Sequence, residues 1–481
     1  MPGDRQESVS RAARVLHRLG LADLLGQVSA RIPGTDQFAI TPAPKRSGTP
    51  FNRLSGADVV VSSLESPRSG EDELPPDVLM HAAVYHRRPD VQAIVHTHQP
   101  LATAFATARR PLLPIGHIEA ELAMDGSMFW GQGQIADGPE RAADLAETLG
   151  THPILLLPCH GVLCVGRSLG EAVMRADHLE QLAQFNLIAG GLGGSVQEVT
   201  RDAFAEISRQ RAHPDRLAGY YDSLLASTSP GPARNPWPDS PELERRLRER
   251  MELACHILYH FGLVAHREHV THRLDAGRFL MTPRGHLGQM TGANIALLDM
   301  ECNWLAGPLP PPPFMTFHRD ILQARSDVQA IVHTHPVFGR LLPITGTPLK
   351  AVHQVGAWQA LSAPPVYPRA DMVFEAEPRR QVVALLDGHA IVHELHHGID
   401  FVAPSLEQAT VWAVHNEMLA QRQYLSTLLG EPATLSSVAD AEGASPPEDI
   451  WWEYYVSILE SSARHHAPVV GGGRGQEARS F

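Results

Sequence analysis

Two pairs of histidines recur in this chain with the same neighbours. The nine residues DVQAIVHTH occupy positions 90–98 and again positions 327–335, and each copy ends in a His-x-His pair. Successive side chains of a β-strand point to opposite faces, so both imidazoles of a pair leave the same face. The apolar run before each pair is typical of a buried strand. The predicted pairs are His96 with His98 and His333 with His335.

A third histidine accompanies each pair at a fixed distance. His160 precedes a glycine, as does His397, and each lies 64 residues after the first histidine of its pair (96 to 160, and 333 to 397). Three neutral imidazoles with an open position are the pattern of catalytic zinc, iron or manganese sites. Core histidines bonded to backbone are the alternative, but they do not explain why three positions recur through so much substitution. We therefore predict a metal site that is built twice.

The duplication extends over most of the chain, with a shift of 237 residues that maps His81 onto His318 and Glu180 onto Glu417. Apolar spacing predicts matching helices and short strands in the two copies. The predicted helices are 8–20, 78–86, 140–149 and 169–189, then 242–262, 317–324, 376–386 and 406–429; the predicted strands are 27–32, 37–41, 269–274 and 278–282. The GGLGG run at 190–194 follows a helix and is interpreted as a helix end rather than a dinucleotide loop.

Length and composition indicate two globular domains. The 481 residues exceed one ordinary core. A segment dense in Pro, Ser and Gly separates the copies, as expected for a linker. The predicted divisions are a first domain at 1–226, the linker at 227–241, a second domain at 242–464 and a disordered tail at 465–481.

The overall charge and the cysteines narrow the class of protein. A net charge of −13 argues against nucleic acid or an anionic membrane as the main partner. No apolar run approaches the roughly 20 residues of a membrane span, and the N-terminus lacks the apolar region of a signal peptide. The four cysteines form no disulfide framework, which fits a reducing cytoplasm. Cys159, beside a candidate ligand, is expected to be a small buried residue.

Several segments of each half resemble the class II aldolase/adducin family, which includes sugar-phosphate aldolases and a ribulose-phosphate 4-epimerase. The matching segments are GQVSAR at 26–31, AITP at 39–42, LMHAAVYHRRPDVQAIVHTHQP at 79–100, CHGVLCVG at 159–166 and LGEAVMRADHLE at 169–180. The resemblance covers nearly all of 8–225 and, more weakly, 245–461. It implies an α/β fold made of two α/β/α domains, each with a mostly antiparallel central sheet flanked by helices.

The resemblance also implies a cofactor and an assembly. It makes the metal ligands His96, His98 and His160 in one copy and His333, His335 and His397 in the other. The implied cofactor is a divalent metal, Zn²⁺ in the first place, with Fe²⁺ or Mn²⁺ as alternatives. The substrate would be a small molecule. Because the family usually forms C4 tetramers with sites between subunits, two fused copies suggest a homodimer that forms a pseudo-tetramer.

The acid position of the family differs between the halves. A glutamate four residues before the helix histidine serves the family as a ligand or as an acid/base. Here that position holds Asp77 in the first copy and Phe314 in the second. Asp77 is the candidate catalytic residue, with a helix N-terminal carboxylate as the alternative interpretation. Phe314 cannot transfer a proton, so the second copy must recruit another group, use different chemistry or be silent. The candidates for recruitment are His353, His393, Glu394 and His396, although an exposed strand end would explain the last three equally well.

The phosphate-binding loops of the family are altered here. The residues that stand at these loops, and are therefore candidate substrate contacts, are Gln27, Ser29, Thr41, His269, Thr282 and Arg284. Backbone amides and hydroxyls that would hold a phosphate are largely missing. We therefore expect a non-phosphorylated substrate. Arg284 would suit the carboxylate of an oxo or hydroxy acid, although an exposed arginine is the alternative.

Three functions remain open at this point. The first is a carbon–carbon lyase of the aldol type, in which a metal binds the carbonyl and adjacent hydroxyl of a small oxo acid or polyol and stabilises an enediolate. The second is a non-haem iron-dependent decarboxylase or oxygenase of secondary metabolism on the same scaffold. The third is a non-catalytic assembly module like adducin, which would be expected to lose the histidines. The sequence favours the first.

Overall fold

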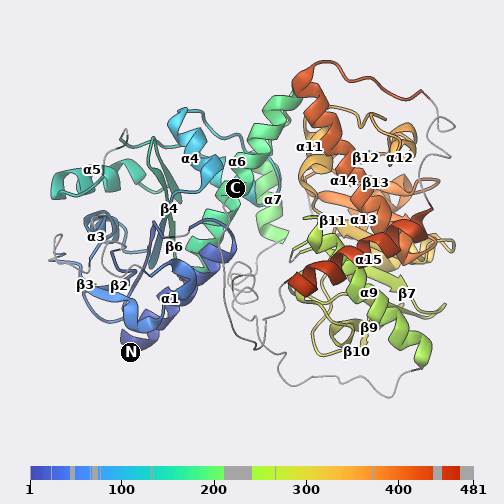
Figure 1. Ribbon diagram of the computed structural model, residues 1–481, viewed down its shortest axis with the longest axis horizontal. Coiled ribbons are helices and arrows are strands. Elements are labelled where there is room, and N and C mark those ends of the chain that lie inside the picture. Colours follow the sequence, from blue (N-terminus) through green and yellow to red (C-terminus); the bar gives the residue numbers. More distant parts are fainter. Residues whose placement is uncertain are drawn as a thin grey trace, which may run out of the picture.

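The computed structural model contains two α/β units that follow one another along the chain (Figure 1). The residues that it describes are 2–22, 24–43, 49–65, 67, 74–75, 77–131, 133, 135–210, 221, 241–265, 267–370, 373–436 and 447–465. The predicted linker, apart from its last residue, and the predicted tail, apart from its first, lie outside them. The proposed domain boundaries therefore stay predictions.

The first unit is built on a six-stranded sheet in the order β3-β2-β1-β4-β6-β5, with antiparallel neighbours throughout. The strand that ends at the first histidine pair, β4, lies at its centre. The elements are α1 (Pro2–Arg18), β1 (Gln27–Arg31), β2 (Gln37–Ile40), η1 (Phe51–Arg53), η2 (Gly56–Asp58), β3 (Val60–Ser63), α3 (Val78–Arg87), β4 (Ala93–Thr97), α4 (Pro100–Thr107), η3 (Glu119–Ala123), α5 (Pro139–Leu149), β5 (Ile154–Leu157), β6 (Gly161–Gly166), α6 (Leu169–Leu192) and α7 (Arg201–Gln210).

The second unit repeats this order and adds a strand at each edge. Its sheet runs β10-β9-β8-β7-β11-β14-β13-β12, antiparallel except for the β12–β13 pair. The elements are α9 (Glu242–His260), β7 (His269–Arg273), β8 (Arg278–Met281), η4 (Leu287–Gln289), η5 (Gly292–Asn294), β9 (Ala296–Asp299), β10 (Trp304–Ala306), α10 (Met315–Ala324), β11 (Ala330–Thr334), α11 (Val337–Ile344), α12 (Ala357–Leu361), β12 (Val366–Tyr367), α13 (Ala376–Leu385), β13 (Ile391–Glu394), β14 (Gly398–Ala403), α14 (Leu406–Leu429) and α15 (Glu448–His465).

Each sheet is covered by helices on both faces, as the central strands show. Ala93 and Val95 of β4 join the core that includes α1 and α6, whereas Ile94 joins the core that includes α3 and α5. In the second unit, Val332 packs with α9 and α14, and Ile331 packs with α10 and α13. Because side chains alternate along a strand, one buried strand supplies both cores. The expected α/β/α architecture is confirmed.

The two units share a packed boundary formed by α6 of the first unit with α11 and α14 of the second (Figure 1). Leu341 and Leu342 of α11 belong to the same apolar core as the first unit. Across the boundary, the backbone N–H of Gln197 donates to the carbonyl of Ile344 at 2.8 Å. The units are therefore joined by apolar packing as well as by the chain itself.

The helices and strands predicted from the repeat are confirmed, with ends shifted by up to three residues except at the start of α1. α1 begins at Pro2 rather than at residue 8, because its first turns are held by polar contacts: Gln6 Nε2 donates to the Val59 carbonyl, and Glu7 accepts from the Gly56 N–H. The end of α6 has the predicted glycine stop, with Gly193 in the left-handed conformation. No helix in the described part of the chain is long and apolar enough to cross a membrane.

Candidate metal centres

The first three histidines converge at the end of β4. His96 is the fourth residue of β4 and His98 follows its end, while His160 lies in the turn between β5 and β6 rather than within a strand. The Nε2 atoms of His96 and His160 are 3.4 Å apart, and one ligand nitrogen from each of the three histidines lies within 4.8 Å of the others. We call these residues the first triad.

The turn that carries the third histidine explains the His-Gly motif. A Cβ added at Gly161 would lie 2.3 Å from the carbonyl oxygen of Thr97, and one at Gly398 would lie 2.5 Å from that of Thr334. Only glycine allows β6 or β14 to pass so close to the histidine strand. The residue before each third histidine has a positive φ, 60° at Cys159 and 66° at His396. Cys159 is exposed, so the expectation that it is buried was wrong.

The glutamates and helix histidines that recur in both copies form hydrogen bonds to elements next to the histidine strands. Glu180 accepts from the Leu101 N–H at 2.8 Å and caps α4, the helix that follows the first pair. Glu417 does the same for α11. The Nδ1 of His81 lies 2.7 Å from a hydroxyl oxygen on β1, and that of His318 lies 2.8 Å from one on β7. These residues hold the elements next to the histidine strand in both copies.

Burial keeps the ligand candidates in the form that binds metal. Burial, with a smaller contribution from His160, lowers the pKa of His96 to about 3. Burial, with the neighbouring histidines, also lowers the pKa of His98 to about 4, and burial lowers that of His335 to about 4. Imidazoles with such pKa values are neutral at pH 7 and offer a lone pair to a cation. The donor set therefore fits a divalent metal in each copy.

Asp77 faces the first triad instead of capping its helix. It is the N-cap residue of α3, yet its side chain makes no capping hydrogen bond. The carboxylate is 5% exposed, and its Oδ1 has no hydrogen-bond partner among the described residues. Burial raises the pKa of Asp77, while His160 and His98 act in the opposite direction. The missing cap hydrogen bond argues against the helix-terminal interpretation, and the acid/base role of Asp77 stays a prediction.

The second triad consists of His333, His335 and His397, and the side chains behind it differ from those of the first. The Nε2 atoms of His333 and His335 are 3.0 Å apart, and the three ligand nitrogens lie within 4.8 Å of one another. Each Nδ1 is bonded to a carboxylate. The pairs are His333 with Asp400 at 2.9 Å, His335 with Glu268 at 2.9 Å and His397 with Glu394 at 2.6 Å.

In the first triad, a backbone carbonyl stands where one of these carboxylates would be. His96 Nδ1 donates to the Val162 carbonyl at 2.8 Å, and the buried Nδ1 of His160 has no hydrogen-bond partner among the described residues. The strand sequences explain this difference. The positions of Asp400 and Glu394 correspond to Leu163 and Leu157 in the first copy.

An aromatic ring closes the second triad where Asp77 stands in the first. Phe314 is 7% exposed and stacks on His397, with ring centroids 5.6 Å apart, and on His333 at 6.1 Å. The ring of His117, from the first unit, also packs against the His397 ring, with the two ring centroids 4.8 Å apart. The second triad is therefore covered by residues of both copies.

A buried charge cluster lies at this contact between the units. Glu119 is 2% exposed, and its Oε1 lies 3.6 Å from the Arg267 guanidinium. Arg340 is also buried, and it donates to the His397 carbonyl at 3.4 Å. Burial raises the pKa of Glu119, but Arg267 and Arg340 together lower it to well below its usual range. The cluster ties the loop after His117 to the second triad.

The predicted substrate contacts occupy several environments. Ser29, Thr41 and Thr282 are fully buried; the hydroxyl of Ser29 bonds to the His81 ring, and those of the two threonines accept from backbone amides. Gln27 and His269 are the cross-strand neighbours of His96 and His333 and therefore lie beside the triads. Arg284 is exposed. A substrate role for these six residues stays a prediction.

The polar cluster of the second copy is buried. His393, Glu394 and His396 are 4%, 1% and 3% exposed, so an exposed strand end does not explain them. Glu394 is the partner of His397 described above. His353 is exposed instead and lies away from the second triad's buried surroundings. Sequence reasoning missed Glu268, Asp400 and His117 as neighbours of the triad; the only signal was that polar residues replace apolar ones on its strands.

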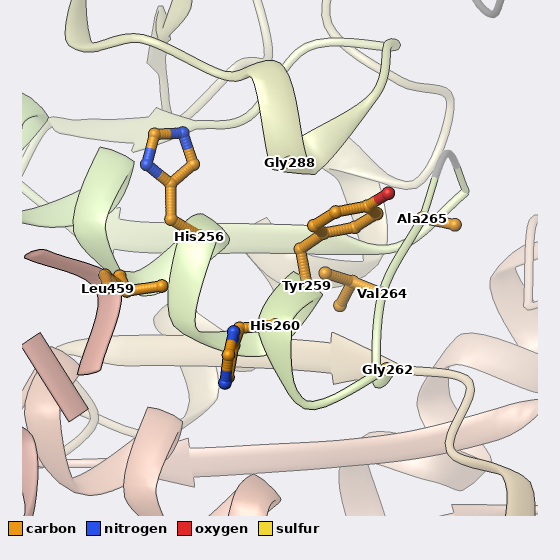
Figure 2. Close-up of a pocket in the computed structure, with 8 residues that line it drawn as sticks. All are labelled: His256, Tyr259, His260, Gly262, Val264, Ala265, Gly288 and Leu459. Atoms are coloured by element: carbon orange, nitrogen blue, oxygen red, sulfur yellow. The ribbon is translucent and has the colours of Figure 1, made fainter. Parts of the chain in front are cut away.

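A separate hollow lies on the second unit, beside the C-terminal end of α9 (Figure 2). It has a volume of about 700 Å³, and three of the residues that line it, His256, Tyr259 and His260, belong to α9 (Figure 2). Its lining includes none of the six triad histidines. It is therefore distinct from both candidate centres.

The chain belongs to the class II aldolase and adducin family. The family model, described as the class II aldolase and adducin N-terminal domain, matches residues 7–187 and again 249–424. The two matches coincide with the two α/β units, which confirms the tandem duplication. Each of the two matched regions contains one triad of histidines.

Relatives of the chain include several kinds of enzyme. It is 29% identical over 232 residues to a 3,4-dihydroxyphthalate decarboxylase of Arthrobacter keyseri, which covers 46% of this chain and 90% of that protein. It is 32% identical over 168 residues to a 5-methylthioribulose-1-phosphate/5-deoxyribulose-1-phosphate aldolase of Rhodospirillum rubrum, covering 32% of this chain and 70% of that protein. Among solved structures, an aldolase II superfamily protein from Pseudomonas syringae is 22% identical, covers 46% of this chain and 91% of its own, and has a TM-score of 0.40.

Proposed function

We propose that the first copy is a metal-dependent carbon–carbon lyase that acts on a small, non-phosphorylated oxo acid or polyol. The observation that carries the proposal is the position of Asp77, a buried carboxylate that is not used to cap its helix and acts electrostatically on His98 and His160. A proton-transfer group next to three imidazoles that can hold a metal is the arrangement that metal-dependent lyase chemistry uses. The second copy has Phe314 at the same place and is not assigned this reaction.

The histidines of the first triad and Asp77 have separate roles in this proposal. His96, His98 and His160 would hold the divalent metal, which supplies Lewis-acid polarisation of a substrate oxygen when bound. The free Oδ1 of Asp77 would take or return the proton that accompanies cleavage of the carbon–carbon bond. Burial around Asp77 excludes water from that transfer.

The loops near the first triad support a substrate without a phosphate. Ser29, which stands in the family's phosphate-binding loop, uses its hydroxyl to bond the His81 ring and the Tyr85 hydroxyl at 2.7 and 2.8 Å. Thr41 accepts from the Val28 N–H at 3.1 Å. Groups already engaged in this way are poor candidates for holding a dianion. A carboxylate or a polyol hydroxyl carries less charge than a phosphate dianion and therefore needs fewer hydrogen-bond donors.

A second candidate function is an iron-dependent decarboxylase or oxygenase on the same scaffold. It is favoured by the relatives named 3,4-dihydroxyphthalate decarboxylase, from Arthrobacter keyseri and from Terrabacter, which are 29% and 28% identical to this chain. Three imidazoles suit Fe²⁺ as well as Zn²⁺ or Mn²⁺. Release of CO₂ from an aromatic or oxo acid, and dependence on oxygen, distinguish this function from aldol cleavage.

We also propose that two chains assemble as a homodimer that forms a pseudo-tetramer. Within one chain, the first unit covers the second triad through His117. The first triad remains partly exposed at His98 and His160 in the described chain. A second chain would complete the first triad if its second unit covered it in the same way. Sedimentation-equilibrium measurement of the mass in solution tests this assembly.

The lyase proposal is tested with the full chain, reconstituted separately with Zn²⁺, Mn²⁺ and Fe²⁺. Small hydroxy acids, oxo acids and polyols are screened for aldehyde and for CO₂ release, with and without oxygen. Asp77→Asn should lower turnover by about 10²–10⁴-fold, the usual contribution of a general acid or base, while metal content stays unchanged. Phe314→Leu at the equivalent position is the matched control. Equal activity of Asp77→Asn and wild type would contradict the proposal, and oxygen-dependent CO₂ release with iron would establish the second candidate.

A further inference from the structure

The second triad has a distinctive layer of negative charge behind it. Asp400, Glu268 and Glu394 are all buried, between 0% and 5% exposed, and each accepts the Nδ1–H of a different triad histidine. The three histidines come from the end of β11 and from one turn, whereas their carboxylate partners come from three places: the residue before β7, the end of β13 and the middle of β14. In the first copy, the corresponding positions hold leucine or glycine.

The first consequence concerns the direction of the lone pairs. When a carboxylate accepts the Nδ1–H, the imidazole is fixed in the tautomer whose Nε2 lone pair points away from it. For His333 and His335, these Nε2 atoms face each other at 3.0 Å. Carboxylate partners of this kind also make the imidazoles more basic ligands. The second triad is therefore held in the geometry that a cation requires.

The second consequence concerns charge balance. The groups that act most strongly on Asp400 are His333, Glu394 and His318, and none of them is a fixed cation. Oxygen atoms of Asp400 and Glu394 lie within 4.8 Å of each other and of a His333 nitrogen. Keeping two buried carboxyls ionised so close together is costly unless they share a proton or opposite charge lies nearby. A divalent ion on the Nε2 side of the histidines would provide that charge.

The third consequence concerns access. His333 and His397 are 2% and 3% exposed, and Phe314 and His117 stack on or beside them. In the first triad, His98 and His160 are partly exposed. Structural metal sites are closed, whereas catalytic sites keep an open position. One histidine of the second triad, His335, is partly exposed, against two in the first, so the second triad is the more closed of the two.

We propose that the second copy holds a structural divalent metal that is retained during turnover and stabilises the contact between the two units, whereas the metal of the first copy exchanges with solution. His397 links the metal to this contact, because its ring packs against His117 and its carbonyl accepts from Arg340. The proposal concerns metal retention alone and does not depend on which reaction the first copy catalyses.

The test counts metal atoms over time. The full chain is loaded with Zn²⁺, transferred into excess EDTA and sampled for protein-bound zinc by mass spectrometry. Wild type should lose one zinc quickly and keep the other at least tenfold longer. His98→Ala should remove only the fast zinc, and His335→Ala only the slow one. The thermal midpoint should fall when the slow zinc leaves and change little when the fast zinc leaves.

Isosteric variants cover the case in which His335→Ala does not fold. Asp400→Asn preserves shape and a hydrogen bond to His333 but removes the charge, and should speed loss of the slow zinc by about 10–100-fold, the usual effect of a partner behind a ligand. Glu171→Gln, which removes the charge of a buried carboxylate paired with Arg175 at the start of α6, is the control and should leave both rates unchanged. Release of both zincs at one rate, a slow zinc that survives in His335→Ala, or no effect of Asp400→Asn would overturn the proposal.

Discussion

The two triads share one backbone design but differ in the side chains around it. Both have a central His-x-His strand, a glycine that lets the next strand pass close, a positive φ before the third histidine and a glutamate that caps the following helix. The first has a carboxylate facing the triad, at Asp77. The second has a ring in that place, at Phe314, and carboxylates behind the histidines instead. The two copies thus share the positions of the histidines, while the position of the negative charge around them differs.

The largest effect that would break this comparison is the loss of one ligand from each triad. His98→Ala should reduce lyase turnover by about a thousandfold, because loss of metal polarisation removes several kcal/mol of transition-state stabilisation. His335→Ala should change turnover by less than tenfold in protein that remains folded. Steady-state kinetics on both variants, with zinc content measured in parallel, makes the comparison. Equal losses in both would show that the two centres act in one reaction.

The glycines after the third histidines offer a symmetrical test. Gly161→Ala and Gly398→Ala each place a Cβ within 2.5 Å of a carbonyl oxygen of the neighbouring strand, so the backbone must move. Each variant should lose about one zinc per chain, from its own copy. Elemental analysis combined with EDTA release identifies which zinc is missing. Gly138→Ala, where an added Cβ meets nothing within 4 Å, is the control for a harmless glycine substitution.

The charge cluster between the units predicts a pH-dependent stability. Replacing Glu119 by Gln removes the ion-pair partner of Arg267 and one of the anions near the buried Arg340, and should cost up to about 3 kcal/mol in the free energy of unfolding at pH 7. The folded-state pKa of Glu119 lies well below its unfolded value, so its stabilisation is present above the unfolded value of 4.5 and is lost as pH falls below it. Urea denaturation from pH 7 to pH 3 should show the Glu119→Gln deficit shrinking at the acid end. A constant deficit would contradict this assignment.

The smallest expected effect concerns the turns before the third histidines. Cys159 is exposed and has a φ of 60°, a conformation that costs a non-glycine residue about 1–2 kcal/mol. Cys159→Gly should therefore raise the free energy of unfolding by up to about 1 kcal/mol, after the extra chain entropy of glycine is subtracted. His396→Gly should gain less, because the His396 side chain is buried and its packing is lost. Thermal denaturation of the two variants gives the difference.

Much of the fold followed from pattern alone. Strands and helices were predictable because the apolar periodicities of two and 3.6 residues appear twice, and the duplication separates repeated positions from incidental ones. The triads were predictable because three histidines recur at fixed spacing. The turn position of His160 was not, since an apolar run shows where a strand is buried but not where its last hydrogen bond falls. Cys159 was misjudged because residue type does not show which side of a turn is covered: at the same turn position Cys159 is exposed and His396 is buried.

The neighbours of the second triad could not be predicted for a different reason. Glu268 reaches His335 only because β7 pairs with β11, and Asp400 reaches His333 only because β14 pairs with β11 on the other side. His117 comes from the other unit altogether. Such contacts depend on register and on docking of the units, which the order of residues along one chain does not state.

The sequence by itself therefore determined the duplication and the six histidines, because each is a property of residue type and spacing. Through its family resemblance it also indicated the layered architecture and the loss of the acid in the second copy. Tertiary structure decided which carboxylates face the histidines, that Asp77 turns toward the first triad, and that the first unit closes the second. Those outcomes depend on which buried groups meet across strands and between units. Because a buried charge without a partner is costly, each buried carboxylate is found next to a group that can pair with it.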